Sequence, residues 1–174
     1  MASGRASGPN GTASFTAADI AGTVEEVRKG RRILCERPML EKGVRLYHAL
    51  RAMVRAGGYT SMSMRCWPEM NEPYIGVSAC LAMGLLLGKG EVTAAACEGD
   101  WPTAVAQTIG TLLSRQPAVC LDWVNHTAGS DIVQLGHCGM GVCGKMACGE
   151  PRGAGPRDAI GVHPVLRQAG KTMG

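Results

Sequence analysis

The chain has 174 residues and a formal net charge of +4 at pH 7, with 45% hydrophobic and 18% charged residues. This length fits one domain that can bury a core without a metal or disulfide, and the composition excludes disorder throughout. The basic residues are spread along the sequence and aromatic residues make up only 4%, so we expect no nucleic-acid partner. The longest uncharged apolar run, residues 74–88, is shorter than the ~18 residues of a spanning helix, so we expect no membrane partner and a cytoplasmic protein.

The first third of the chain predicts two helices after a leader. Residues 1–14 are small and polar, and we expect a flexible leader there. Thr16 to Asp19 carries an N-cap signal before a short helix over 19–28. Apolar residues then recur at spacings of three and four, which predicts an amphipathic helix over 40–57 that stops at a pair of glycines.

Beyond this helix, short apolar runs alternate with helical segments. We predict strands near residues 59–65, 92–97, 118–124 and 132–136. We predict helices over 75–87 and 103–114. The alternation predicts an α/β fold of three layers, a Rossmann-like parallel sheet flanked by helices, formed as a single domain over residues 15–150. Residues 151–174 are expected to form an irregular tail.

Polar sequences follow the predicted strands at their carboxyl ends, where parallel sheets bind ligands. They are CWPE from Cys66, CEGDW from Cys97, DWVNH from Asp122 and HCG from His137. Neighbouring strands lie about 4.8 Å apart, so the carboxylates of Glu98 and Asp122 could share a cation. His137 would complete a set of two oxygens and one nitrogen suited to Mn²⁺, Mg²⁺ or Zn²⁺. The alternative is that Glu98 caps the following helix and Asp122 is solvated.

Other residues near these strand ends have two open interpretations each. Three tryptophans adjoin a predicted strand end: Trp67, Trp101 and Trp123. They could present flat apolar faces to the C–H groups of a sugar, or they could cover the core. Arg65 could bind a hydroxyl or an anionic group, or pair with Glu69. His126 could reach the site, or be a solvated loop residue.

The eight cysteines allow a rival interpretation. Without an apolar signal sequence, we expect reduced thiols rather than a disulfide framework. Cys138, Cys143 and Cys148 recur every five residues beside His137 and could form a zinc-binding module. Zinc ribbons use C-x₂₋₄-C pairs at a spacing that is absent here, so small buried cysteines are the other interpretation.

Five ordered motifs resemble the L-fucose and L-arabinose isomerase superfamily over roughly residues 35–174. They are RCWPEM at 65–70, the apolar helix at 76–86, ACEGDWPTA at 96–104, LDWVN at 121–125 and LGHCG at 135–139. The resemblance implies an aldose–ketose isomerase that binds a divalent cation, usually Mn²⁺, through Glu98, Asp122 and His137. It implies that Glu98 and Asp122 also carry the proton transfer through an enediol. The sugar-site residues that we expect are Arg65, Trp67, Glu69, Trp101, Trp123 and His126.

The resemblance also implies a longer protein, because superfamily members have an N-terminal α/β domain before this region and a β-rich domain after it. We therefore expect a central catalytic fragment whose tail, 151–174, leads to a missing C-terminal domain. For the full-length protein we expect a small sugar such as L-fucose or an arabinose as substrate, and a homo-oligomer. A non-catalytic sugar-binding or assembly domain of the same fold is the alternative.

Overall fold

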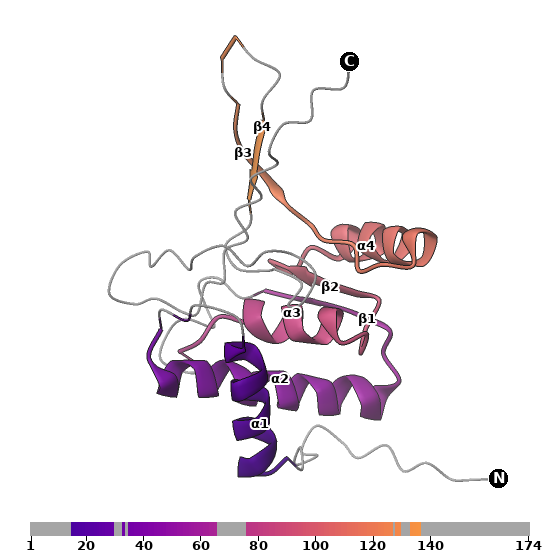
Figure 1. The fold of residues 1–174 in the computed structure, drawn as a ribbon. Helices are drawn as coiled ribbons and strands as arrows, with labels where there is room; N and C mark the ends of the chain where they lie inside the picture. Colours follow the sequence, from indigo (N-terminus) through magenta and orange to yellow (C-terminus); the bar gives the residue numbers. More distant parts are fainter. Residues whose placement is uncertain are drawn as a thin grey trace, which may run out of the picture.

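Two parallel strands packed between helices form the centre of the molecule (Figure 1). The computed structural model describes residues 15–29, 33, 35–65, 76–126, 128–129 and 133–136. The predicted leader, 1–14, and the predicted tail, 151–174, lie outside these residues.

The first helix, α1 (Ala17–Arg28), begins at a capping box. The Asp19 N–H donates to Thr16 Oγ1 at 3.2 Å, and the Thr16 N–H donates to Asp19 Oδ2 at 2.7 Å. These bonds satisfy backbone donors that a helix start leaves without intrahelical partners. The predicted helix over 19–28 is confirmed, with its start two residues earlier.

The second helix, α2 (Arg37–Gly57), packs against α1 and confirms the predicted amphipathic helix. It ends at Gly58, whose φ of +63° is a left-handed conformation that glycine adopts without strain. In the interface with α1, Thr23 Oγ1 lies 3.0 Å from Nε2 of the buried His48. This hydrogen bond satisfies two polar groups that burial would otherwise leave without water.

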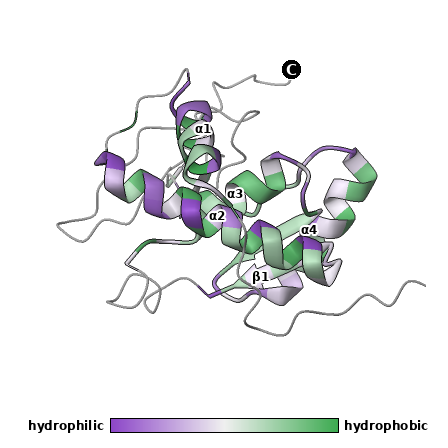
Figure 2. Cartoon of the chain, turned by 90° about the horizontal axis from the view of Figure 1, so that it is seen from below, coloured by the Kyte–Doolittle hydropathy of each residue, from purple (hydrophilic) through white to green (hydrophobic). Residues whose placement is uncertain are grey.

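The most buried helix is α3 (Cys80–Gly88), in which residues 80–87 are all buried. It lies between α2 and the sheet, so side chains on every side of it meet the core. Figure 2 shows the contrast between the hydrophobic colouring of α3 and the mixed colouring of α2. In the described part of the chain, no helix is both long enough and apolar enough to cross a bilayer.

The parallel sheet contains β1 (Ser61–Met64) and β2 (Ala94–Cys97), in a register that pairs Ser61 with Ala94 and Met64 with Cys97. The chain passes from β1 through α3 to β2, which is the crossover that parallel strands need. Both predicted strands are confirmed, with narrower bounds.

The other face of the sheet is covered by α4 (Trp101–Ser114) (Figure 1). Small side chains allow a close approach, because Ala94 and Ala96 of the sheet form a buried cluster with Ala104 of the helix. The helix α3, the sheet and α4 therefore form three successive layers. The coarse prediction of a mixed α/β fold with helices on both faces of a parallel sheet is confirmed.

The prediction of four parallel strands is wrong. The two later strands, β3 (Asp122–His126) and β4 (Val133–Gly136), pair with each other in an antiparallel hairpin that extends from the helices and sheet (Figure 1). Only six residues join them, whereas a parallel pair requires a crossover of about a dozen or more. In the described residues, β2 pairs with β1 alone.

Candidate functional site

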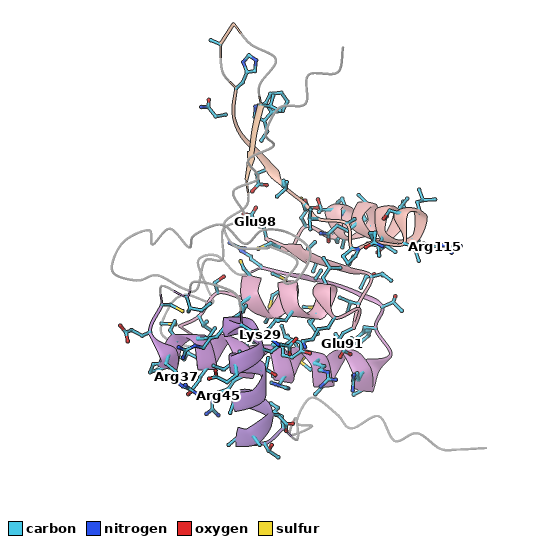
Figure 3. The ribbon with its side chains drawn as sticks, viewed as in Figure 1. Lys29, Arg37, Arg45, Glu91, Glu98 and Arg115 are labelled. Atoms are coloured by element: carbon cyan, nitrogen blue, oxygen red, sulfur yellow. The ribbon has the colours of Figure 1, made fainter. Side chains whose placement is uncertain are left out.

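A tight turn at the carboxyl end of β2 positions Glu98. Glu98 and Gly99 both have left-handed backbones, with φ of +61° and +73°. Glycine tolerates this conformation, but it costs a residue with a side chain about 1–2 kcal/mol. Backbone strain of this kind is concentrated at functional sites, where the rest of the fold maintains it. Figure 3 shows Glu98 at the end of the sheet that faces the hairpin.

The residue that caps α4 is Asp100, so the alternative in which Glu98 caps this helix is wrong. The Thr103 N–H and hydroxyl donate to the Asp100 carboxylate at 3.0 and 2.5 Å. The side-chain and backbone hydrogen bonds from Thr103 lower the pKa of Asp100. An aspartate at the N-cap followed by a proline in the first turn is a start signal for a helix. α4 therefore begins at Trp101, two residues before the predicted start at residue 103.

The two parallel strands end side by side, which brings Arg65 next to the turn. Met64 pairs with Cys97, so Arg65 and Glu98 are the first residues beyond the two strands. A Cβ placed on Gly99 would lie 3.6 Å from Cβ of Arg65, so the backbone of the turn contacts this arginine. A cationic side chain thus lies beside the carboxylate turn. Its alternative partner, Glu69, lies outside the described residues.

The half-buried Cys120 lies in the segment 117–121, which follows α4 and returns toward the turn at Glu98 and Gly99. Burial raises the pKa of Cys120, a hydrogen bond with Thr103 lowers it, and the charges of Asp122, Asp100 and Glu98 raise it. The three carboxylates therefore act on one thiol, although they come from two segments of the chain. No sequence pattern points to Cys120, because its position depends on how residues 117–121 pack along α4.

Three further predicted site residues, Asp122, Trp123 and His126, lie on β3 of the hairpin. Asp122 was expected near the end of a parallel strand, but it is the first residue of β3 and pairs with Gly136. Trp101 is 70% exposed and Trp123 is 68% exposed, so neither covers the core. His126 is also exposed, at the far end of β3 from Asp122.

The carboxylates have the donor chemistry of a Mn²⁺ or Mg²⁺ site, since these cations prefer oxygen ligands. In the described part of the chain, however, no three histidine, cysteine, aspartate or glutamate residues come close enough together to hold a metal ion. Three predicted site residues, Trp67, Glu69 and His137, lie outside that part. So does the cysteine series Cys138, Cys143 and Cys148. Cys35, Cys80, Cys97 and Cys120, all in the described part, form no disulfide bond.

Comparison with known proteins adds one relative. The chain is similar to Sulfoquinovose isomerase of Clostridium sp. (strain MSTE9), with 33% identity over 130 residues. The matched region is 75% of this chain and 27% of that protein, so the chain spans about a quarter of the length of this curated relative. No family model matches the chain, and no solved structure matches it significantly. One partial homologue, which is named as an isomerase, thus supports the resemblance to sugar isomerases.

Proposed function

We propose that this chain supplies the sugar- and cation-binding part of an aldose–ketose isomerase. The similarity to Sulfoquinovose isomerase over three quarters of the chain carries this proposal. The structure is compatible with it, since Arg65 and Glu98 follow adjacent strand ends and the charge of Asp122 acts on the same thiol as that of Glu98.

The chemistry requires a base that moves one proton between neighbouring carbons. In the aldose-to-ketose direction, the C2–H bond breaks, a C1–H bond forms, and the O2 hydroxyl proton passes to O1. A carboxylate beside the sugar can accept the proton from C2 and return it to C1. We assign this role to Glu98 and Asp122, both of which are exposed at the surface. A divalent cation, Mn²⁺ in the first instance, would stabilise negative charge on the two sugar oxygens when bound.

The cation would be held by Glu98 and Asp122, with a further ligand from outside the described residues. His137 is the proposed third ligand. Support comes from the hairpin register, because Asp122 pairs with Gly136, the residue that precedes His137 in the chain.

Four described residues are proposed to contact the sugar: Arg65, Trp101, Trp123 and His126. All four side chains are exposed, so a ligand could reach them. The indole rings of the tryptophans would pack on sugar C–H groups, and the arginine and histidine would bind hydroxyl or anionic groups. Trp67 and Glu69 are proposed for the same site from the sequence motif alone.

The substrate is proposed to be a small aldose. Candidates are L-fucose, L-arabinose and D-arabinose, from the superfamily resemblance, and sulfoquinovose, from the relative. An anionic substituent would favour contact with Arg65, because a guanidinium binds oxyanions through two parallel hydrogen bonds.

The test is to incubate the purified chain with each of these four sugars and Mn²⁺, and to measure sugar binding, ketose formation and Mn²⁺ binding in the same samples. We expect ketose from at least one sugar, loss of turnover on adding a chelator, and exchange of the C2 proton with solvent. Sugar binding without turnover in any sample would instead support the non-catalytic sugar-binding domain. Turnover that survives the chelator would contradict the cation-dependent mechanism.

A further inference from the structure

The segment that leads from α4 to Asp122 runs back along the helix. The chain reverses at Arg115, whose left-handed φ of +54° directly follows the end of α4 (Figure 3). The Gln116 N–H then donates to Ser114 Oγ, in the last turn of the helix, at 3.2 Å. Residues 117–121 return toward the start of α4 (Figure 1). This path ends at Asp122, the first residue of β3.

Polar side chains on one face of α4 bind this segment. The Ala118 N–H donates to Thr111 Oγ1 at 3.0 Å, and the side-chain amide of Gln107 donates to the Ala118 carbonyl oxygen at 3.4 Å. One turn nearer the start of the helix, Thr103 forms a hydrogen bond with Cys120. These three helix residues are four apart in the sequence, so they lie along one face of α4. We call Thr103, Gln107 and Thr111 the α4 ladder.

A glycine allows the segment to lie close to the helix. A Cβ placed on Gly110 would lie 3.1 Å from Cβ of Ala118, a separation shorter than most Cβ contacts. Glycine is less favourable than alanine in the middle of a helix, so its presence at this contact fits a requirement for space. The next residue of the segment, Val119, packs against the main hydrophobic core. The segment is therefore held both by α4 and by the core.

The hairpin itself does not determine where Asp122 lies relative to Glu98. Among the described helices and strands, β3 contacts β4 alone. The pairing of Asp122 with Gly136 therefore orients the carboxylate within the hairpin but does not relate it to the end of β2. In the described part of the chain, that relation depends on the segment 117–121, which joins α4 to β3.

We propose that the α4 ladder and Gly110 position Asp122 relative to Glu98 in the cation site. This inference rests on the proposed function, because it assigns positioning residues to that site. Asp122 is two residues beyond Cys120, or about 7 Å of extended chain, so the ladder restricts where its carboxylate can lie. Glu98 is two residues before Asp100, the N-cap of α4, so one helix positions both carboxylates. Ligands held in this way by supporting hydrogen bonds bind a metal more tightly.

The first test is the backbone order parameter of Asp122 in the metal-free chain, measured by NMR relaxation. Thr111→Val keeps the shape of the side chain but removes the oxygen that accepts from the Ala118 N–H. We expect the order parameter to fall from about 0.85, typical of rigid backbone, toward about 0.6. Thr111→Ser keeps the hydroxyl and should retain the parent value. The matched control is Thr108→Val, which removes a hydroxyl of the same helix that contacts Ser61 of β1 instead, and it should also retain the parent value.

The second test is Mn²⁺ affinity, which relates the ladder to the site. Loss of a residue that supports a metal ligand typically lowers affinity by roughly 10–100-fold. We expect a loss of this size in Thr111→Val, and no further loss when Thr111→Val is added to Asp122→Asn, because the ladder acts through Asp122. Gly110→Ala should lower the affinity in the same way. Alanine is the better helix former, so this second variant keeps α4 folded.

The two measurements separate positioning from a general effect on the helix. Parental order parameters and parental Mn²⁺ affinity in both Thr111→Val and Gly110→Ala would overturn the proposal. So would equal losses in Thr108→Val, or a further loss of affinity when Thr111→Val is added to Asp122→Asn. A parent that binds no Mn²⁺ would contradict the proposed function instead, and the order parameters would then decide whether the ladder holds Asp122 in place.

Discussion

A partly buried ion-pair network between α2 and Glu91 gives the sharpest stability prediction. Glu91 lies in the segment between α3 and β2 and is labelled in Figure 3. It accepts hydrogen bonds from Arg51 Nε at 2.7 Å and from Arg55 Nε and Nη2 at 2.9 Å each. These bonds attach α2 to the segment that leads into β2. We therefore expect Glu91→Gln, which keeps the size but removes the charge, to destabilise the fold.

The magnitude follows from the exposure of the three side chains. Glu91 is 12% exposed, but Arg51 and Arg55 are 33% and 59% exposed and can recover water when the carboxylate is lost. Breaking a fully buried pair costs ~3–5 kcal/mol and an exposed pair contributes ~0.2–1 kcal/mol, so we expect a loss of about 1–2 kcal/mol. In a chain of this size, this corresponds to a decrease in Tm of roughly 3–6 °C.

The effect should depend on pH. Burial by itself raises the pKa of Glu91, but the hydrogen bonds from Arg55 and Arg51 outweigh it, so this pKa lies below its ordinary value. A carboxyl group with a lowered pKa stabilises the fold above its unfolded pKa of about 4.3, and this contribution is lost as the pH falls through the lowered folded pKa. The difference in stability between the parent and Glu91→Gln should therefore be full at pH 7 and decrease below about pH 4.3.

The assay is urea unfolding followed by circular dichroism at several pH values, with Glu26→Gln as the matched control. Glu26 pairs with Lys89 at 2.6 Å, but these side chains are 57% and 30% exposed, so the control should lose less than about 0.5 kcal/mol. Equal losses in the two variants would refute the argument from burial. A loss in Glu91→Gln that stays constant down to acid pH would refute the assignment to its charge.

Three further substitutions test the packing and the turn. Leu86→Ala removes a fully buried side chain from α3 and should lower the free energy of unfolding by about 2–5 kcal/mol, measured by urea titration. A decrease below about 1 kcal/mol would contradict the place of Leu86 in the core. Asp100→Ala removes the N-cap of α4 and should lower Tm by a few degrees, whereas Asp100→Asn, which can still cap, should lower it less. Glu98→Gly should raise the free energy of unfolding by about 1 kcal/mol, because glycine adopts the left-handed conformation of this residue without strain, and a decrease in Tm would contradict this.

The helices and the central sheet could be predicted because local signals agree with the tertiary packing. α2 has apolar residues at helical spacing and glycines at its end, and it forms with nearly the predicted bounds. β1 and β2 are short runs flanked by turn residues, and α3 supplies the long crossover between them. These elements position Arg65 and Glu98 together, as the strand-end argument anticipated.

The hairpin departs from the prediction because the strand-helix-strand pattern does not continue past α4. The six residues between β3 and β4 are too few for a parallel crossover, so the length of this connection is the feature of the sequence that indicates an antiparallel pair. The left-handed backbone of Glu98 could not be predicted from residue type, because glutamate has no preference for this conformation. The position of Cys120, which is hydrogen-bonded to Thr103 and subject to the charges of three carboxylates, depends on tertiary packing, which no local pattern encodes.

The central claim is that Glu98 and Asp122 together serve a cation-dependent sugar isomerase. The most direct measurement compares Mn²⁺ affinity and ketose formation in the parent, Glu98→Gln, Asp122→Asn and the control Asp100→Asn, which changes a neighbouring carboxylate that caps α4. We expect both measurements to fall in the Glu98 and Asp122 variants, with turnover lower by roughly 10²–10⁴-fold, and to stay near the parent values in the control. Parental Mn²⁺ affinity in both Glu98→Gln and Asp122→Asn, or equal losses in all three variants, would contradict the claim.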